Sequence, residues 1–147
     1  MAAQTILLKT MGHHEEGEAD GAISPGMAVE LAADGKFDQV QATQAEALKG
    51  VAGLKIATED ALQGKTVNDA YAATDRFFFY QPIPGDHVQV LIKDGETIAI
   101  GDTLVVEGGG SGLFVEAAGT ETHYQFEALE AVSPSGSNGL VAARALI

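Results

Sequence analysis

The stretch AISPGMAVEL, residues 22–31, places a Ser-Pro-Gly corner directly before a run in which apolar and acidic residues alternate. YAATDRFFF at 71–79 and IAIGDTLVV at 98–106 repeat its spacing: an apolar residue, then a corner residue three positions later, then apolar residues at positions six and eight. Glycine at a corner permits a positive φ, and strand residues two apart share one face. The repeat therefore predicts corners at Gly26, Thr74 and Gly101, each turning the chain into a strand that points alternate residues into a core.

Short β-prone runs fill the rest of the chain, separated by turn residues about every eight to twelve positions, as in β-barrels and β-sandwiches. Strands are predicted at 5–9, 27–31, 37–41, 54–58, 76–81, 87–93, 103–106, 113–117, 124–132 and 140–146. Thr43 and Glu46 have the spacing of a capping box, which predicts one short helix. We therefore expect an all-β fold with minor α content: an extended N-terminal arm at 1–12 and a single compact β-barrel or sandwich domain at 13–147.

Acidic charge dominates the composition, with 21 Asp and Glu against 8 Lys and Arg and a formal charge of −13. Nucleic-acid binding needs clustered cations, and only Arg76 and Arg144 supply guanidinium groups, so no nucleic-acid partner is expected. The absence of a long apolar run or a leader pattern predicts no membrane partner. Concentrated salt screens such a surface, with a Debye length of about 3 Å at 1 M. A halophilic source and an ordinary acidic bacterial protein both account for the charge.

Catalytic motifs are not recognisable in the sequence. The serines lie in turn-like segments, and none occupies a GxSxG elbow. The glycine-rich EGGGSG at 107–112 lacks the GK[ST] ending of a phosphate-binding loop, so we interpret it as a hairpin tip. A small hydrolase using His87 or His123 is the weakest of the functional alternatives, because neither histidine has partners at a readable spacing. We expect no enzymatic activity and no cofactor.

One segment offers metal donors: GHHEEGEADG at 12–21 contains His13, His14, Glu15 and Glu16. Sequential residues rarely converge on one ion, and the flanking glycines favour a mobile loop. We expect no specific metal site there. Loose binding of a divalent cation by the carboxylates is the alternative.

Aromatic residues occupy outward positions of the repeat. The residue between the two inward ones is Glu30 in the first copy, Phe78 in the second and Val105 in the third, and Tyr80 follows on the same side as Phe78. Aromatic side chains are enriched at the centres of protein interfaces. Either another segment of this chain covers the two rings, or Phe78 and Tyr80 form an oligomer interface.

TILLK at 5–9, GAISPGMAVEL at 21–31, ALQGKTVNDAYAATDRFFF at 61–79 and IAIGDTL at 98–104, in this order, resemble the head decoration (capsid cement) proteins of tailed viruses of bacteria and archaea. The chain departs from the family pattern at Thr74, where glycine is usual, and at the His-Glu segment. The resemblance implies a β-rich protein without enzymatic activity. Such a protein binds the outside of an icosahedral head, commonly as trimers, and reinforces the lattice.

The partners implied are the major capsid protein and further copies of this chain, on the outer surface of a virion assembled from protein made in the host cytoplasm. With the acidic composition, the resemblance suggests a virus of a halophilic archaeon. Thr5, Ile6, Leu7 and Leu8 would form the capsid contact, as an arm that adds to a capsid-protein strand. A strand of the chain's own barrel is the alternative for this segment. For the whole chain, the alternative function is a small ligand-binding or carrier β-barrel.

Overall fold

The computed structural model describes residues 5–40, 54–119 and 125–146, and its fold is all-β as predicted. The short helix predicted near 43–48 lies outside these residues. In the described ranges the helical content is one 3-10 turn, Ala61–Gln63, and no helix is long and apolar enough to cross a membrane. The strands are β1 Leu7–Lys9, β2 His13–Glu18, β3 Ala28–Leu31, β4 Phe37–Gln39, β5 Lys55–Thr58, β6 Arg76–Gln81, β7 His87–Ile92, β8 Thr103–Val106, β9 Phe114–Glu116, β10 Phe126–Ala128 and β11 Gly139–Ala145.

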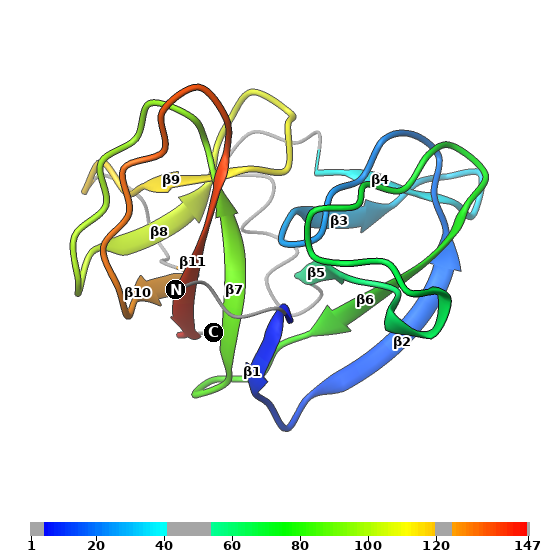
Figure 1. Cartoon of the computed structure of the whole chain (residues 1–147), viewed down its shortest axis with the longest axis horizontal. Helices are drawn as coiled ribbons and strands as arrows, with labels where there is room; N and C mark the ends of the chain where they lie inside the picture. Colours follow the sequence, from blue (N-terminus) through cyan, green and yellow to red (C-terminus); the bar gives the residue numbers. More distant parts are fainter. Residues whose placement is uncertain (1–4, 41–53, 120–124, 147) are drawn as a thin grey trace.

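These strands form two sheets that lie side by side (Figure 1). The six-stranded sheet has the order β1-β7-β11-β10-β8-β9, with a parallel contact between β7 and β9. The five-stranded sheet has the order β2-β6-β5-β3-β4. A parallel bridge between Ala19 and Phe37 joins its two ends, so this sheet closes into a small barrel. The strand β2 was not predicted: the expected mobile loop at 12–21 is largely the strand that completes this barrel.

The barrel has its own apolar interior. Phe77 and Phe79 of β6 pack there against Phe37, with ring centroids 5.5 and 4.6 Å apart. Gly17 leaves room for this stack, because a Cβ at that position would lie 2.7 Å from the Phe37 ring. Burial raises the pKa of Tyr71 to about 12, so its hydroxyl stays neutral and donates a 2.6 Å hydrogen bond to the Thr58 carbonyl.

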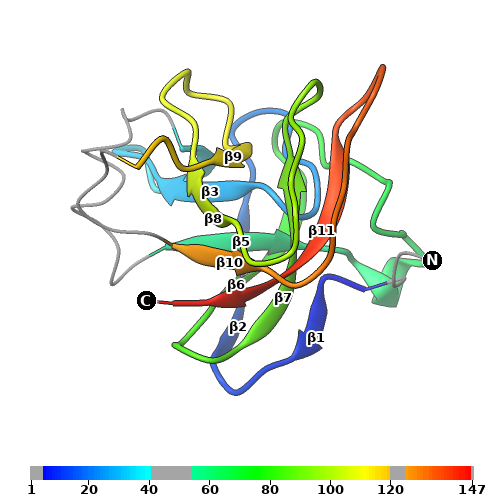
Figure 2. The same cartoon turned by 90° about the vertical axis from the view of Figure 1, so that its left-hand side faces the viewer.

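A second, larger core fills the space between the barrel and the six-stranded sheet. Val88, Val90 and Ile92 of β7 face this space, and Ile56 and Tyr80 of the barrel meet them there. Figure 2 shows the same arrangement from the side, with β1 and β2 diverging from their shared turn.

The three predicted corners are confirmed. Gly26, Thr74 and Gly101 all have positive φ, at 93°, 70° and 90°. Two corners also pair with each other, because a bridge links Ile23 of the first copy to Tyr71 of the second. The inward assignment fails at Leu31, which is 60% exposed because the short strand β3 ends there beyond the barrel interior.

Thr74 is the only described non-glycine residue with positive φ. Replacing Thr74 with Gly should therefore stabilise the protein by about 0.5–1 kcal/mol. Relief of about 1–2 kcal/mol of left-handed strain outweighs the extra chain entropy of glycine in the unfolded state. Urea unfolding followed by circular dichroism measures the effect. Gly101→Ala, at a corner with open space around the added Cβ, is the reverse control and should destabilise. A less stable Thr74→Gly variant would contradict this account of the corner.

Candidate functional site

The segment predicted as a capsid-binding arm lies against the chain's own sheet. Ile6 is fully buried, and its carbonyl accepts a 2.8 Å hydrogen bond from the Gln89 N–H. The Gln89 side-chain amide donates to the Thr5 carbonyl at 2.7 Å. Leu7 packs at the edge of the core, and Leu8 is 38% exposed. The segment is therefore an edge strand of the six-stranded sheet, as in the alternative interpretation, and its one core side chain excludes a free arm at 5–8.

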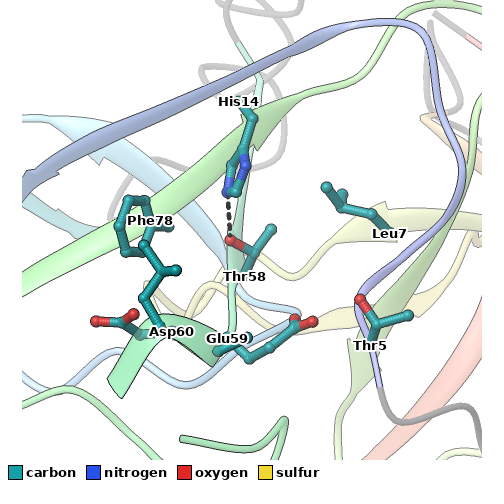
Figure 3. A pocket seen from close by; sticks show the side chains of 9 residues that line it. Thr5, Leu7, His14, Thr58, Glu59, Asp60 and Phe78 are labelled. Carbon is teal, nitrogen blue, oxygen red and sulfur yellow. Dashed lines mark hydrogen bonds between the residues drawn. The ribbon is translucent and has the colours of Figure 1, made fainter. Parts of the chain in front are cut away.

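Beside this edge strand the space between the sheets opens into a pocket of about 350 Å³ (Figure 3). We call it the edge pocket. The residues that line it lie in or next to β1, β2, β5, β6 and the 3-10 turn: Thr5, Leu7, His14, Thr58, Glu59, Asp60, Ala61, Leu62 and Phe78. Tyr80 and Ile56 pack in the core against the six-stranded sheet, whereas the next residues along the same face, Phe78 and Thr58, line the edge pocket.

Two rings and a hydroxyl form one wall of the edge pocket. The His14 Nε2 lies 3.0 Å from the Thr58 Oγ1, and the His14 ring lies 5.5 Å from the Phe78 ring (Figure 3). Arg76 lies 5.3 Å from the Phe78 ring centroid, in cation–π range. These contacts hold Phe78 in place while leaving it half-buried. The wall is therefore apolar with a polar margin.

Two carboxylates lie at the inner side of the pocket. Asp60 is buried and caps the start of the 3-10 turn, where its carboxylate accepts a 3.3 Å hydrogen bond from the Gln63 N–H. It also lies 4.0 Å from Arg76. The half-buried Glu59 accepts a 3.0 Å hydrogen bond from the Ile6 N–H. Leu62 projects from the same turn and is 85% exposed. The pocket thus combines apolar walls with negative charge.

The predicted interface aromatics have different environments. Tyr80 points away from the barrel interior, on the same side as Phe78, but it is only 2% exposed because the six-stranded sheet covers it, so it is not open to an oligomer interface. The alternative interpretation, that another segment of the chain covers the ring, holds for Tyr80. Phe78 lines the edge pocket and is only partly covered. Of the two, Phe78 alone remains available to a second molecule.

The Tyr80 hydroxyl leads to a buried carboxylate that sequence reasoning missed. Asp86 accepts hydrogen bonds from the Tyr80 hydroxyl at 2.6 Å, from the Met11 N–H at 2.8 Å and from the Ile83 N–H at 3.0 Å. The Gly12 N–H in turn donates to the Tyr80 oxygen. Burial alone would raise the pKa of Asp86, but the donated hydrogen bonds outweigh it and hold the pKa below its usual value. The only sequence signal is an aspartate at the end of a Pro-Ile-Pro-Gly turn.

The metal-donor segment does not converge. His13, His14, Glu15 and Glu16 belong to β2, where neighbouring side chains point to opposite faces. Within the residues that the structure describes, no group of three His, Asp or Glu side chains could hold a metal ion. His87 begins β7 opposite Lys9, and His123 lies outside the described residues.

The glycine-rich segment connects β8 to β9 as an antiparallel pair, which confirms the predicted hairpin tip. Lys93 donates a 2.6 Å hydrogen bond to Glu107, and the Ser111 hydroxyl donates to the same carboxylate. Burial works to raise the pKa of Glu107, but these two donors lower it. Ser111 is thus a loop-closing residue.

No protein-family model and no curated protein sequence matches this chain. Among solved structures, the chain is similar to the head fiber gp8.5 N base of bacteriophage phi29. The TM-score is 0.51 at 14% sequence identity, and the match covers 92% of this chain and 94% of the other. At this identity the likeness establishes a shared fold, and it extends over nearly the whole of both chains.

Replacing Asp86 with Asn should destabilise the protein by about 2 kcal/mol at pH 7, because a buried charged acceptor is lost while its donors remain. The folded-state pKa lies below the ordinary 3.8, so the carboxylate stabilises the fold above that value, and this contribution disappears as pH falls through the folded pKa. The difference between the variant and the parent protein should therefore narrow below about pH 4. Thermal unfolding between pH 2.5 and 7 tests this.

Asp94→Asn, in the exposed turn after β7, is the matched control and should unfold like the parent protein. If Asp86→Asn and the parent protein unfold alike at pH 7, Asp86 does not have the stabilising role derived from its hydrogen bonds.

Proposed function

We propose that this chain is a structural protein of a virus head, which binds the outer surface of an icosahedral capsid as homotrimers and stabilises the lattice. The likeness in fold to a phage head fiber base, over almost the full length of both chains, carries the proposal. This likeness in fold is independent of the sequence motifs that resemble head decoration proteins, and it supports the same role. The proposed partners are the major capsid protein and two further copies of this chain, on the virion.

The described surface suits association. Leu8, Met11, Leu31, Leu62, Ile83 and Ile100 are exposed large apolar side chains. Leu8 lies in β1, and Met11 follows it in the β1–β2 turn. Asp86 joins this turn to the β6–β7 turn, which carries Ile83. Exposed apolar residues that gather on a rigid part of a protein mark interaction surfaces more often than scattered ones do.

We assign the capsid contact to β1, as an edge strand of the sheet and not as a flexible arm. Thr5 and Leu7 line the edge pocket and Ile6 lies in the core, which leaves Leu8 as the exposed apolar side chain of the predicted contact segment. Because β1 is the outermost strand of its sheet, its backbone is also accessible to a partner strand. A short, rigid edge strand thus replaces the flexible arm.

A small ligand-binding or carrier barrel is the second candidate, and the edge pocket is the observation that favours it. Its volume of about 350 Å³ is near the lower end of the range for ligand pockets, roughly 300–1,000 Å³. Under this alternative the protein binds a small molecule and has no affinity for virus heads.

Head binding distinguishes the two candidates directly. The purified protein should bind undecorated heads of the virus that encodes it, and electron microscopy should show added density at local three-fold positions. Leu8→Asp should keep the circular dichroism and the solution mass of the parent protein but lose at least about tenfold in head affinity, because a charge replaces a buried apolar contact. Deletion of residues 1–10 would remove Ile6 from the core and is less informative.

Leu31→Asp, at an exposed apolar residue of the barrel, is the matched control and should bind heads normally. Binding of Leu8→Asp at full occupancy would move the capsid contact elsewhere. Absence of any binding by the parent protein, across low and high salt, would refute the head-associated function.

A further inference from the structure

We propose that copies of this chain associate by inserting the tip of one copy into the edge pocket of the next. The tip consists of Lys9, Met11 and Ile83. The proposal rests on the homotrimer of the proposed function and names the two surfaces that would form it. The occupant of the edge pocket is therefore a second copy of this chain.

The tip is a prearranged apolar projection. The Met11 side chain is 85% exposed and that of Ile83 is 43% exposed, although the backbone of each residue is held by a hydrogen bond. Their backbone N–H groups donate to the two oxygens of a single carboxylate, that of Asp86. The shared carboxylate thus holds the backbones of two separate turns near each other, one carrying Met11 and the other Ile83. A partner that buries them need not first order the turns, which reduces the entropic cost of association.

The edge pocket offers surfaces of matching chemistry. Leu7, Leu62 and Phe78 provide apolar walls, and the pocket is large enough for a methionine side chain. Methionine adapts its shape to irregular pockets and makes favourable contacts with aromatic rings. Leu62, exposed at the rim, would be covered by the inserted tip. Insertion would thereby bury exposed apolar residues from both surfaces.

Charge complementarity sets the direction of the contact. Within the described part of the chain, Lys9 forms no salt bridge, whereas Lys36, Lys65, Arg76, Lys93 and Arg144 each lie within 4.0 Å of a carboxylate. Glu59 in the edge pocket accepts a hydrogen bond from the neutral backbone N–H of Ile6. A tip carrying Lys9 therefore brings a positive charge to a negatively charged pocket, on a chain whose net charge of −13 otherwise opposes self-association.

The positions of tip and pocket favour a closed ring. The tip combines the end of β1 and the β1–β2 turn with Ile83 of the β6–β7 turn, and β1 and β2 also contribute residues to the lining of the edge pocket (Figures 1 and 3). A contact between two different surfaces is heterologous, and it closes into a cyclic oligomer when the rotation per copy is right. Two surfaces that lie close together on one chain can meet around a shared axis, as a trimer requires.

Disulfide trapping tests the contact, because the chain contains no cysteine. Met11→Cys and Leu62→Cys are prepared separately and then mixed under mild oxidation. The mixture should form a disulfide-linked dimer at least about tenfold faster than either variant alone, because bound copies hold the two thiols at a high effective concentration. Ile100→Cys mixed with Leu62→Cys is the matched control, since Ile100 is an exposed apolar residue outside the tip.

Solution mass supplies the second readout. Light scattering should give a trimer for the parent protein and for Leu31→Asp, and monomers for Met11→Asp and Leu62→Asp, because each places an unpaired charge in an apolar contact. Lys9→Glu should weaken the trimer, and added salt should reduce that difference. Circular dichroism checks that every variant is folded.

Each outcome bears on the proposal. Cross-linking of the 11/62 mixture no faster than the control, or a trimer that survives Met11→Asp, would overturn tip-to-pocket association while leaving head binding unaffected. An isologous dimer would place two like surfaces together and would also overturn it. A small molecule that fills the edge pocket and excludes the tip would favour the carrier function instead. Failure of the parent protein to bind heads, with the cross-link formed as expected, would refute only the proposed function.

Discussion

The buried Asp86 carboxylate is the constraint on which the arrangement of the two sheets depends. It accepts the backbone N–H groups of Met11 and Ile83, which belong to the β1–β2 and β6–β7 turns, and the hydroxyl of Tyr80 between the sheets. The backbone carbonyl of Asp86 accepts a 2.8 Å hydrogen bond from the N–H of Ala145 in β11. One residue therefore links the edge strands of both sheets to the centre of the larger one. Hydrogen bonds to a charged, buried acceptor are among the stronger ones in proteins.

Closure of the five-stranded barrel makes its packing against the six-stranded sheet possible. Its interior is filled by its own aromatic residues, so its outer face is free to pack against the six-stranded sheet. Thr58 and the half-buried Phe78, on this same face, line the edge pocket. The concave surface on which the proposed association depends thus lies where residues of both sheets and of the 3-10 turn meet.

Acidity and self-association place opposing demands on this chain. Most described cations are used in ion pairs within the chain, such as Lys36 with Glu18 and Arg144 with Glu127. Exposed pairs of this kind contribute little to stability, but they neutralise local charge. The proposed contact between copies would use apolar burial for affinity and one lysine for direction. Apolar burial persists in concentrated salt, where repulsion between acidic copies is screened.

The sequence by itself determined the all-β class, the three corners and the approximate position of most strands. These features are local: a positive φ needs glycine or strain, and alternation follows from the two-residue period of a strand. Only the tertiary structure decided that the polar run HHEEGE is strand β2, because its partner β6 and the closure at Ala19 supply a pairing that its composition does not signal. The burial of Ile6 and Tyr80, the open position of Phe78 and the role of Asp86 depend equally on contacts between segments distant in sequence. Periodicity indicates which side of a strand a residue is on, whereas the relative position and length of the two sheets decide what covers that side.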